Sequence, residues 1–154
     1  MGCCCFKTSI TPITNLTNSI VNFLLQSGRI EQRDLQIHQA IISSVLRSGP
    51  DGLVEVCRYI QAKDGENIFF LIDQFEEIFR FKDTGDVDFA NDAAGYVNLL
   101  MNAVHQREVP VYISINMRSD FIGDCAVFSG LTQMINESNY LVPQMTREQK
   151  KMAH

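Results

Sequence analysis

The chain has 154 residues, 45% of them hydrophobic, and its 13 basic and 18 acidic side chains give a formal net charge of −5. That length suits one domain, the apolar share argues against wholesale disorder, and the acidic excess argues against a dedicated nucleic-acid binder. No apolar run approaches the ~20 residues that cross a bilayer, and the start lacks the basic region of a signal peptide. We therefore expect a cytoplasmic domain whose partners are neither nucleic acid nor membrane.

The cysteines predict buried, reduced thiols rather than a metal site or a disulfide framework. They are Cys3, Cys4, Cys5, Cys57 and Cys125. Neighbouring cysteines rarely bind one metal, because about two to four residues usually separate paired ligands. A chain without an export signal also gives little reason to expect disulfides.

Strand and helix patterns alternate along the first half, as in α/β proteins. Residues 3–10 predict a short strand, and Pro12 opens a helix whose apolar residues recur until Gly28. A second helix fits residues 33–47, and apolar positions between 53 and 60 mark a third.

The second half holds two strands that should be central in a sheet. Residues 67–73 contain five consecutive apolar side chains, which predicts a strand buried on both faces of a parallel sheet. A long helix follows, with apolar residues in register from 89 to 104, and then a second central strand over residues 109–117. A helix around residues 131–135 and a short strand at 140–142 come next.

The strongest chemical signal follows the first of these strands. Asp73 ends the apolar run, and Glu76 and Glu77 come three and four residues later. Open α/β folds bind ligands at the carboxyl ends of their strands. The pattern suits a nucleoside triphosphatase, in which the aspartate holds Mg²⁺ through water and a glutamate orients or deprotonates the attacking water. The alternative is a strand followed by a solvated acidic turn.

An arginine follows the second strand. Arg118 comes directly after the mostly apolar residues 111–117. A guanidinium there could bind a γ-phosphate through two parallel hydrogen bonds, a geometry that lysine lacks. The alternative is that the arginine pairs with Asp120 or with a loop carbonyl. Because both strands should open on the same edge of the sheet, we expect Asp73 and Arg118 on one rim, around a triphosphate.

Four segments resemble parts of the novel STAND NTPases, P-loop NTPases related to the NACHT and AP-ATPase families. Residues 73–80 (DQFEEIFR) resemble their Walker B segment, and residues 117–123 (MRSDFIG) resemble the segment after their sensor strand. Residues 140–149 (YLVPQMTREQ) resemble the entry into their helical lid, and residues 11–16 (TPITNL) are similar to the junction after their P-loop helix.

The resemblance implies a partial P-loop NTPase fold of the ASCE/STAND type, which is a three-layer α/β sandwich with a mainly parallel sheet. It implies a core over residues 1–145 and the start of the helical lid over residues 146–154, where a capping-box pattern predicts a helix. Family members are signalling switches, so fused or neighbouring signalling or repeat domains are the implied partners.

The resemblance also implies a role for each candidate residue. Asp73 would be the Mg²⁺ ligand, and Arg118 would read the γ-phosphate during catalysis. Glu76 or Glu77 would be the general base, and the pattern does not choose between them. The implied cofactors are ATP and Mg²⁺.

The sequence departs from the family at the phosphate-binding loop. That loop needs the pattern Gly-x-x-x-x-Gly-Lys-Ser/Thr, and the chain contains no Gly-Lys pair. The family's loop and first strand would lie before Met1, so we expect a truncated domain that binds ATP weakly by itself. Two other classes stay open: a non-catalytic interaction remnant, and a phosphoacceptor receiver domain with Asp73 at a strand end.

Overall fold

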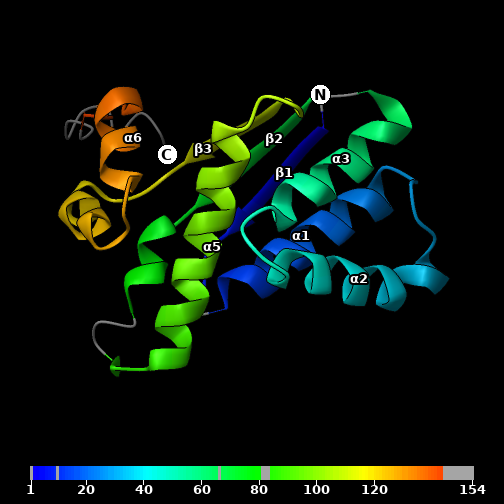
Figure 1. Ribbon diagram of the computed structural model, residues 1–154, viewed down its shortest axis with the longest axis horizontal. Helices are drawn as coiled ribbons and strands as arrows, with labels where there is room; N and C mark the ends of the chain where they lie inside the picture. Colours follow the sequence, from blue (N-terminus) through cyan, green and yellow to red (C-terminus); the bar gives the residue numbers. More distant parts are fainter. Residues whose placement is uncertain (1, 10, 66, 81–83, 144–154) are drawn as a thin grey trace, which may run out of the picture.

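The computed structural model describes residues 2–9, 11–65, 67–80 and 84–143 (Figure 1). The strands are β1 (Gly2–Lys7), β2 (Ile68–Asp73) and β3 (Val111–Ile115). The helices are α1 (Pro12–Gln26), α2 (Leu35–Arg47), α3 (Gly52–Asp64), α5 (Val87–His105) and α6 (Leu131–Ser138), and the 3-10 segments are η1 (Gln32–Asp34), η2 (Phe75–Arg80) and η3 (Ser119–Val127). Strands and helices alternate as predicted, which is compatible with an α/β fold.

The strands form one parallel sheet in the order β1-β2-β3. Lys7 pairs with Asp73, and Ile72 pairs with Ile115, so the carboxyl ends of the strands lie at one edge. The central position of β2 agrees with the prediction. The central position predicted for β3 is wrong within the described residues, because β3 pairs there with β2 alone and forms an edge.

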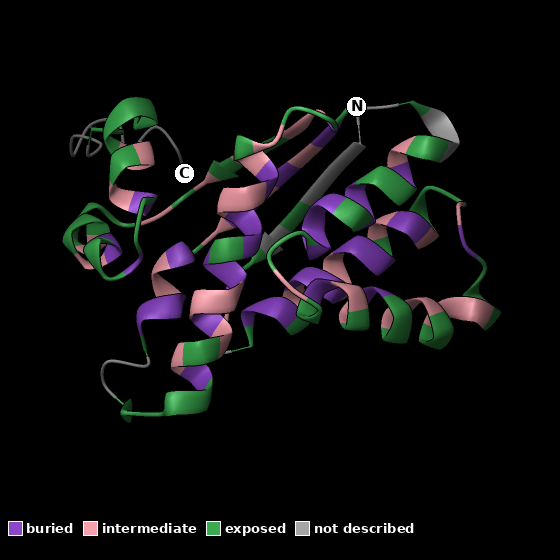
Figure 2. Cartoon of the chain, viewed as in Figure 1, coloured by how far each residue is buried: buried purple, intermediate pink, exposed green. Residues whose placement is uncertain are grey.

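Helices α1, α2, α3 and α5 form a layer on one face of the sheet, whereas α6 packs on η3. Helix α1 packs on β1, α5 packs on β3, and the two helices contact each other. Ile68, Phe70 and Ile72 of β2 are buried, and buried residues (purple in Figure 2) run along α1, α3 and α5. Among the described residues no second helical layer covers the other face, so the predicted three layers are seen in part.

The opposite face of the sheet stays partly open to solvent. Tyr112 is 50% exposed, and Phe69 and Leu71 are only partly buried. The prediction that residues 67–73 are buried on both faces is therefore wrong, because burial alternates along β2 with the face that the helices cover. Cys5, in register with Leu71, is exposed as well, so the prediction of buried thiols holds for Cys57 and Cys125 but not for Cys5.

The strand predicted at residues 140–142 does not form. Tyr140, Leu141 and Val142 are 86%, 68% and 75% exposed. A strand requires a neighbour for its backbone groups, and no described strand lies beside this segment. The helix predicted to begin at residue 146 lies outside the described residues.

Tyr96 of α5 is a fully buried phenol beneath the carboxyl edge of the sheet. Its ring lies beside that of Phe75, with 6.4 Å between the ring centroids. Neither the Tyr96 hydroxyl nor that of Thr8 has a partner in hydrogen-bond geometry among the described residues. Burial raises the pKa of Tyr96, and the Thr8 hydroxyl opposes only part of that shift.

We expect Tyr96→Phe to leave the free energy of unfolding at pH 7 within about 1 kcal/mol of wild type, since the Thr8 hydroxyl interacts with Tyr96 only outside hydrogen-bond geometry. Above pH ~10 the unfolded phenol ionises while the folded one keeps its proton, so wild type loses stability as pH rises and Tyr96→Phe loses less. Urea unfolding at pH 7 and at high pH measures both effects, with the half-exposed Tyr112→Phe as control. A loss well above 1 kcal/mol at pH 7 would contradict an unpartnered hydroxyl.

Candidate functional site

Asp73 lies at the carboxyl end of the central strand, and both its main chain and its side chain accept hydrogen bonds. The Thr8 N–H donates to the Asp73 carbonyl oxygen at 2.8 Å, which extends the ladder with β1. The Asn116 side-chain amide, just past β3, donates to Asp73 Oδ1 at 2.8 Å. Within the part of the chain that the structure describes, no group donates to Oδ2, so one carboxylate oxygen is available to a ligand.

A left-handed residue reverses the chain after Asp73. Gln74 has a φ of 56°, the one positive φ at a non-glycine residue among those described. Such a conformation carries strain, and it persists where the surroundings determine it. Here the next residue, Phe75, is buried and donates its N–H to the Asn116 carbonyl oxygen at 3.1 Å. The turn therefore begins η2 at a defined place beside the end of β3.

The two glutamates of η2 have different surroundings. Glu77 forms an ion pair with Arg80, with 3.0 Å between the carboxylate and guanidinium atoms. Glu76 has its Oε2 atom buried without a hydrogen-bond partner in the described chain. A carboxylate oxygen that is withdrawn from water and unpaired is costly, and it marks a place where water or an ion would be stabilised. The structure thus gives Glu76 and Glu77 different surroundings, a difference that the sequence pattern did not reveal.

Arg118 lies three residues past β3 and engages its near neighbour. Its Nη2 and Nε donate to the two carboxylate oxygens of Asp120 at 2.7 and 3.2 Å. The pair with Asp120, which the sequence left open as the alternative to a phosphate contact, is therefore present. Both side chains are more than half exposed, and an exposed pair of this kind contributes only about 0–1 kcal/mol. The pair can therefore exchange for a stronger anionic partner at little cost.

Aromatic rings join the segments that follow the two strands. Phe79 of η2 stacks on Phe121 of η3, with 6.2 Å between centroids, and lies 5.9 Å from the ring of Phe128. The Arg118 guanidinium lies over the Phe121 ring, 5.4 Å from its centroid. This packing ties the loop that carries Arg118 to the turn that carries Glu76.

Asp73 and Arg118 thus follow neighbouring parallel strands at one edge of the sheet, and Asn116 connects the two strand ends. Asn116 is the residue of this site that the sequence reasoning missed. The signal that could have found it is an amide at the end of an apolar strand, two residues before the arginine.

The donor set at this edge fits Mg²⁺. The described residues include no group of three or more His, Cys, Asp or Glu side chains that could hold a metal by themselves. Mg²⁺ does not need one, because it keeps several waters and usually binds one or two carboxylates together with substrate phosphates. The available Oδ2 of Asp73 is an oxygen donor of the required kind.

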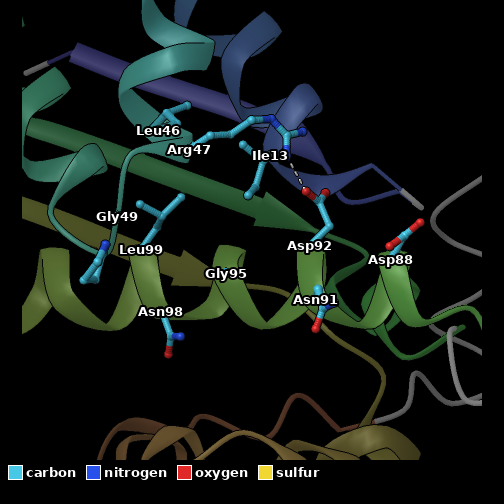
Figure 3. A pocket seen from close by; sticks show the side chains of 11 residues that line it. Ile13, Leu46, Arg47, Gly49, Asp88, Asn91, Asp92, Gly95, Asn98 and Leu99 are labelled. Carbon is cyan, nitrogen blue, oxygen red and sulfur yellow. Dashed lines mark hydrogen bonds and ion pairs between the residues drawn. The ribbon is translucent and has the colours of Figure 1, made fainter.

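Two hollows lie on the helical side of the molecule. One of about 450 Å³ lies between α1, α5 and the turn after α2, where Arg47 of α2 binds Asp92 of α5 at 2.7 Å (Figure 3). The other, of about 680 Å³, adjoins it and shares Arg47, Asp88 and Asp92. Neither is lined by Asp73 or Arg118, although Arg80, the ion-pair partner of Glu77, lines the second.

Comparison with known proteins bears directly on this site. A family model described as Novel STAND NTPase 1 matches residues 3–153, which include both motif segments and all the candidate residues. Searches of curated proteins and of solved structures found no match. No described helix has the length and apolar character needed to cross a membrane. The match covers nearly the whole chain and sets the receiver-domain alternative aside: the chain belongs to the Novel STAND NTPase 1 family.

Proposed function

We propose that the chain is part of a nucleotide-dependent switch domain that binds ATP with Mg²⁺ and hydrolyses it in the cytoplasm. The observation that carries the proposal is the sheet edge where Asp73, held by Asn116, lies in the same turn region as the unpaired Glu76 oxygen. Family membership supports it, since the family is one of NTPases. The fold we propose for the whole domain is the three-layer P-loop sandwich, with residues 1–145 in its core and residues 146–154 at the start of the lid.

In this proposal each side chain has one task. Asp73 would hold the metal, with Oδ2 as the oxygen left free for it, and Glu76 would orient the attacking water and accept its proton. Arg118 releases Asp120 and forms a fork on the γ-phosphate. Bound Mg²⁺ supplies charge neutralisation on the transferred phosphate. Glu77, already neutralised by Arg80, keeps a structural role.

The phosphate cradle is the part that this chain does not supply. Its sequence contains no Gly-Lys pair, and the described β3 has an open edge where a further parallel strand would fit. We propose that a strand and loop outside this chain complete the site, and that signalling or repeat domains couple it to a response.

Glu76→Gln is expected to lower ATP turnover about 100-fold or more, because a general base contributes a factor of that order. Glu77→Gln is the matched control, since it makes the same change on a residue paired with Arg80, and we expect less than about a three-fold effect. The measurement is Mg²⁺-dependent phosphate release by a protein in which a strand and a phosphate-binding loop precede this chain. Equal losses in the two variants would remove Glu76 as the base.

The rival proposal is a non-catalytic interaction remnant, which the missing Gly-Lys pair favours. The same assay decides between the two. If the protein that carries the loop folds and binds nucleotide but releases no phosphate above background, the chain is a remnant and the hydrolysis proposal fails.

A further inference from the structure

Asn116 makes three hydrogen bonds to residues 72–75, the segment that contains the candidate metal ligand Asp73. Its N–H donates to the Ile72 carbonyl oxygen at 2.7 Å, and its carbonyl oxygen accepts from the Phe75 N–H at 3.1 Å. Its side-chain Nδ2 donates to Asp73 Oδ1 at 2.8 Å. One residue therefore contacts the position before Asp73, the Asp73 carboxylate itself and the second position after it.

We infer that Asn116 is a positioning residue for the Asp73 carboxylate. The torsion that rotates a carboxylate is soft, so an unrestrained aspartate would sample many orientations. The Asn116 amide holds Oδ1 and leaves Oδ2 for a ligand. A neutral donor also preserves the negative charge of Asp73, whereas an arginine in its place would compensate it. Outer partners of this kind orient metal ligands in proteins. The inference rests on the proposed function, because it assumes that Asp73 is a metal ligand.

The same residue also determines where the turn after β2 goes. Gln74 is strained, and a strained residue needs surroundings that hold it. The bonds from Asn116 to Ile72 and Phe75 enclose Gln74 on both sides and are made by the main chain. They therefore remain in any substitution at position 116 that keeps the backbone path, and only the bond to Asp73 depends on the amide.

Because only the bond to Asp73 comes from the side chain of Asn116, a substitution at this position tests that bond by itself. Asn116 is exposed, and a hydrogen bond in solvent contributes little to the free energy of unfolding. If the Asn116 side chain has only a structural role, its loss would therefore change the stability of the fold or have no effect. If it positions Asp73, its loss would weaken the binding of a metal.

The experiment titrates Mn²⁺, a paramagnetic stand-in for Mg²⁺, into the 154-residue chain. Broadening of the backbone amide resonances of residues 73–77 measures its affinity. We expect Asn116→Ala to weaken Mn²⁺ binding about ten-fold or more, which is the usual cost of losing an outer partner of a metal ligand. Ser114→Ala is the matched control at an exposed position of β3, two residues before Asn116, and should bind as wild type does. Thermal unfolding midpoints of both variants should match wild type.

Each outcome separates this inference from the proposed function. If Asn116→Ala binds Mn²⁺ as tightly as wild type while Asp73→Asn does not bind, the metal site stands and the positioning role is wrong. If wild type shows no broadening near Asp73, the positioning role is wrong, and phosphate release by the protein that carries the loop decides the proposed function separately. Asn116→Thr, which keeps a hydroxyl donor, should recover part of the affinity and serves if the alanine variant is poorly folded. The threonine variant could fold and still bind Mn²⁺ at least ten-fold more weakly than wild type and no more tightly than the alanine variant. That result would show that a hydrogen-bond donor at position 116 does not position Asp73.

Discussion

Asp73→Asn is expected to abolish Mg²⁺-dependent ATP turnover in a protein that supplies a phosphate-binding loop ahead of this chain. The asparagine keeps the shape of the side chain and an oxygen that can accept from Asn116, so the turn at Gln74 should stay in place. What it removes is the negative charge that holds the metal. A catalytic metal contributes several kcal/mol to the transition state, and each 1.36 kcal/mol is a factor of ten in rate. We therefore expect a loss of at least about 100-fold, with an unfolding free energy within about 0.5 kcal/mol of wild type.

Two further variants test whether the loss of turnover comes from the proposed site at the sheet edge. Arg118→Ala should lower turnover at least about ten-fold, because it removes the guanidinium proposed to meet the γ-phosphate. Asp88→Asn makes the same chemical change as Asp73→Asn on a residue that lines both hollows of the helical side, and it should leave turnover unchanged. Unchanged hydrolysis in Asp73→Asn and Arg118→Ala would remove the site assignment. A large loss in Asp88→Asn alone would move the site to the hollows.

Gly52→Ala is expected to destabilise the fold by about 3 kcal/mol, although alanine favours a helix by about 1 kcal/mol over glycine. Gly52 begins α3, and an added Cβ would lie 2.3 Å from the Val45 carbonyl oxygen and 2.9 Å from the Leu46 Cα. Both are backbone atoms of α2, so no side-chain rotation can relieve the contact. Leu46 is 1% and Leu53 is 0% exposed, which means that moving α2 and α3 apart would open the core at that point.

Urea unfolding of the purified chain measures this effect. Gly123→Ala is the control, because an added Cβ at Gly123 would meet no heavy atom within 4 Å and its φ is not positive. It should change the unfolding free energy by less than about 0.5 kcal/mol. Equal midpoints for the two variants would mean that α2 and α3 are not packed as closely as the structure has them.

Much of the fold could be predicted because the sequence patterns are local. Leu16, Ile20 and Leu24 recur at helical spacing and form the fully buried stripe of α1. The apolar run before Asp73 predicted β2, and the shared direction of parallel strands predicted that Asp73 and Arg118 would follow strands at one edge. Such inferences need no knowledge of which strand lies beside which.

The failures depend on neighbours that a local pattern does not contain. Residues 140–142 have β-forming side chains, but strand preference reflects packing against a partner, and none is described beside them. Cys5 was expected to be buried because the sheet was expected to be covered on both faces. Glu76 and Glu77 differ through the path of a 3-10 segment that follows a left-handed Gln74, which sequence spacing alone does not reveal. Asn116 was missed for a related reason, since its three bonds join segments about 43 residues apart in sequence.

The open side of the sheet has a consequence for how the chain behaves in solution. An unpaired strand edge is a template for a second strand, and among the described residues β3 presents such an edge next to the half-exposed ring of Tyr112. Exposed Leu141 and Val142 add further apolar surface. We therefore expect concentrated samples to self-associate through this edge, and a charged substitution on it, such as Ser114→Lys, to reduce that association.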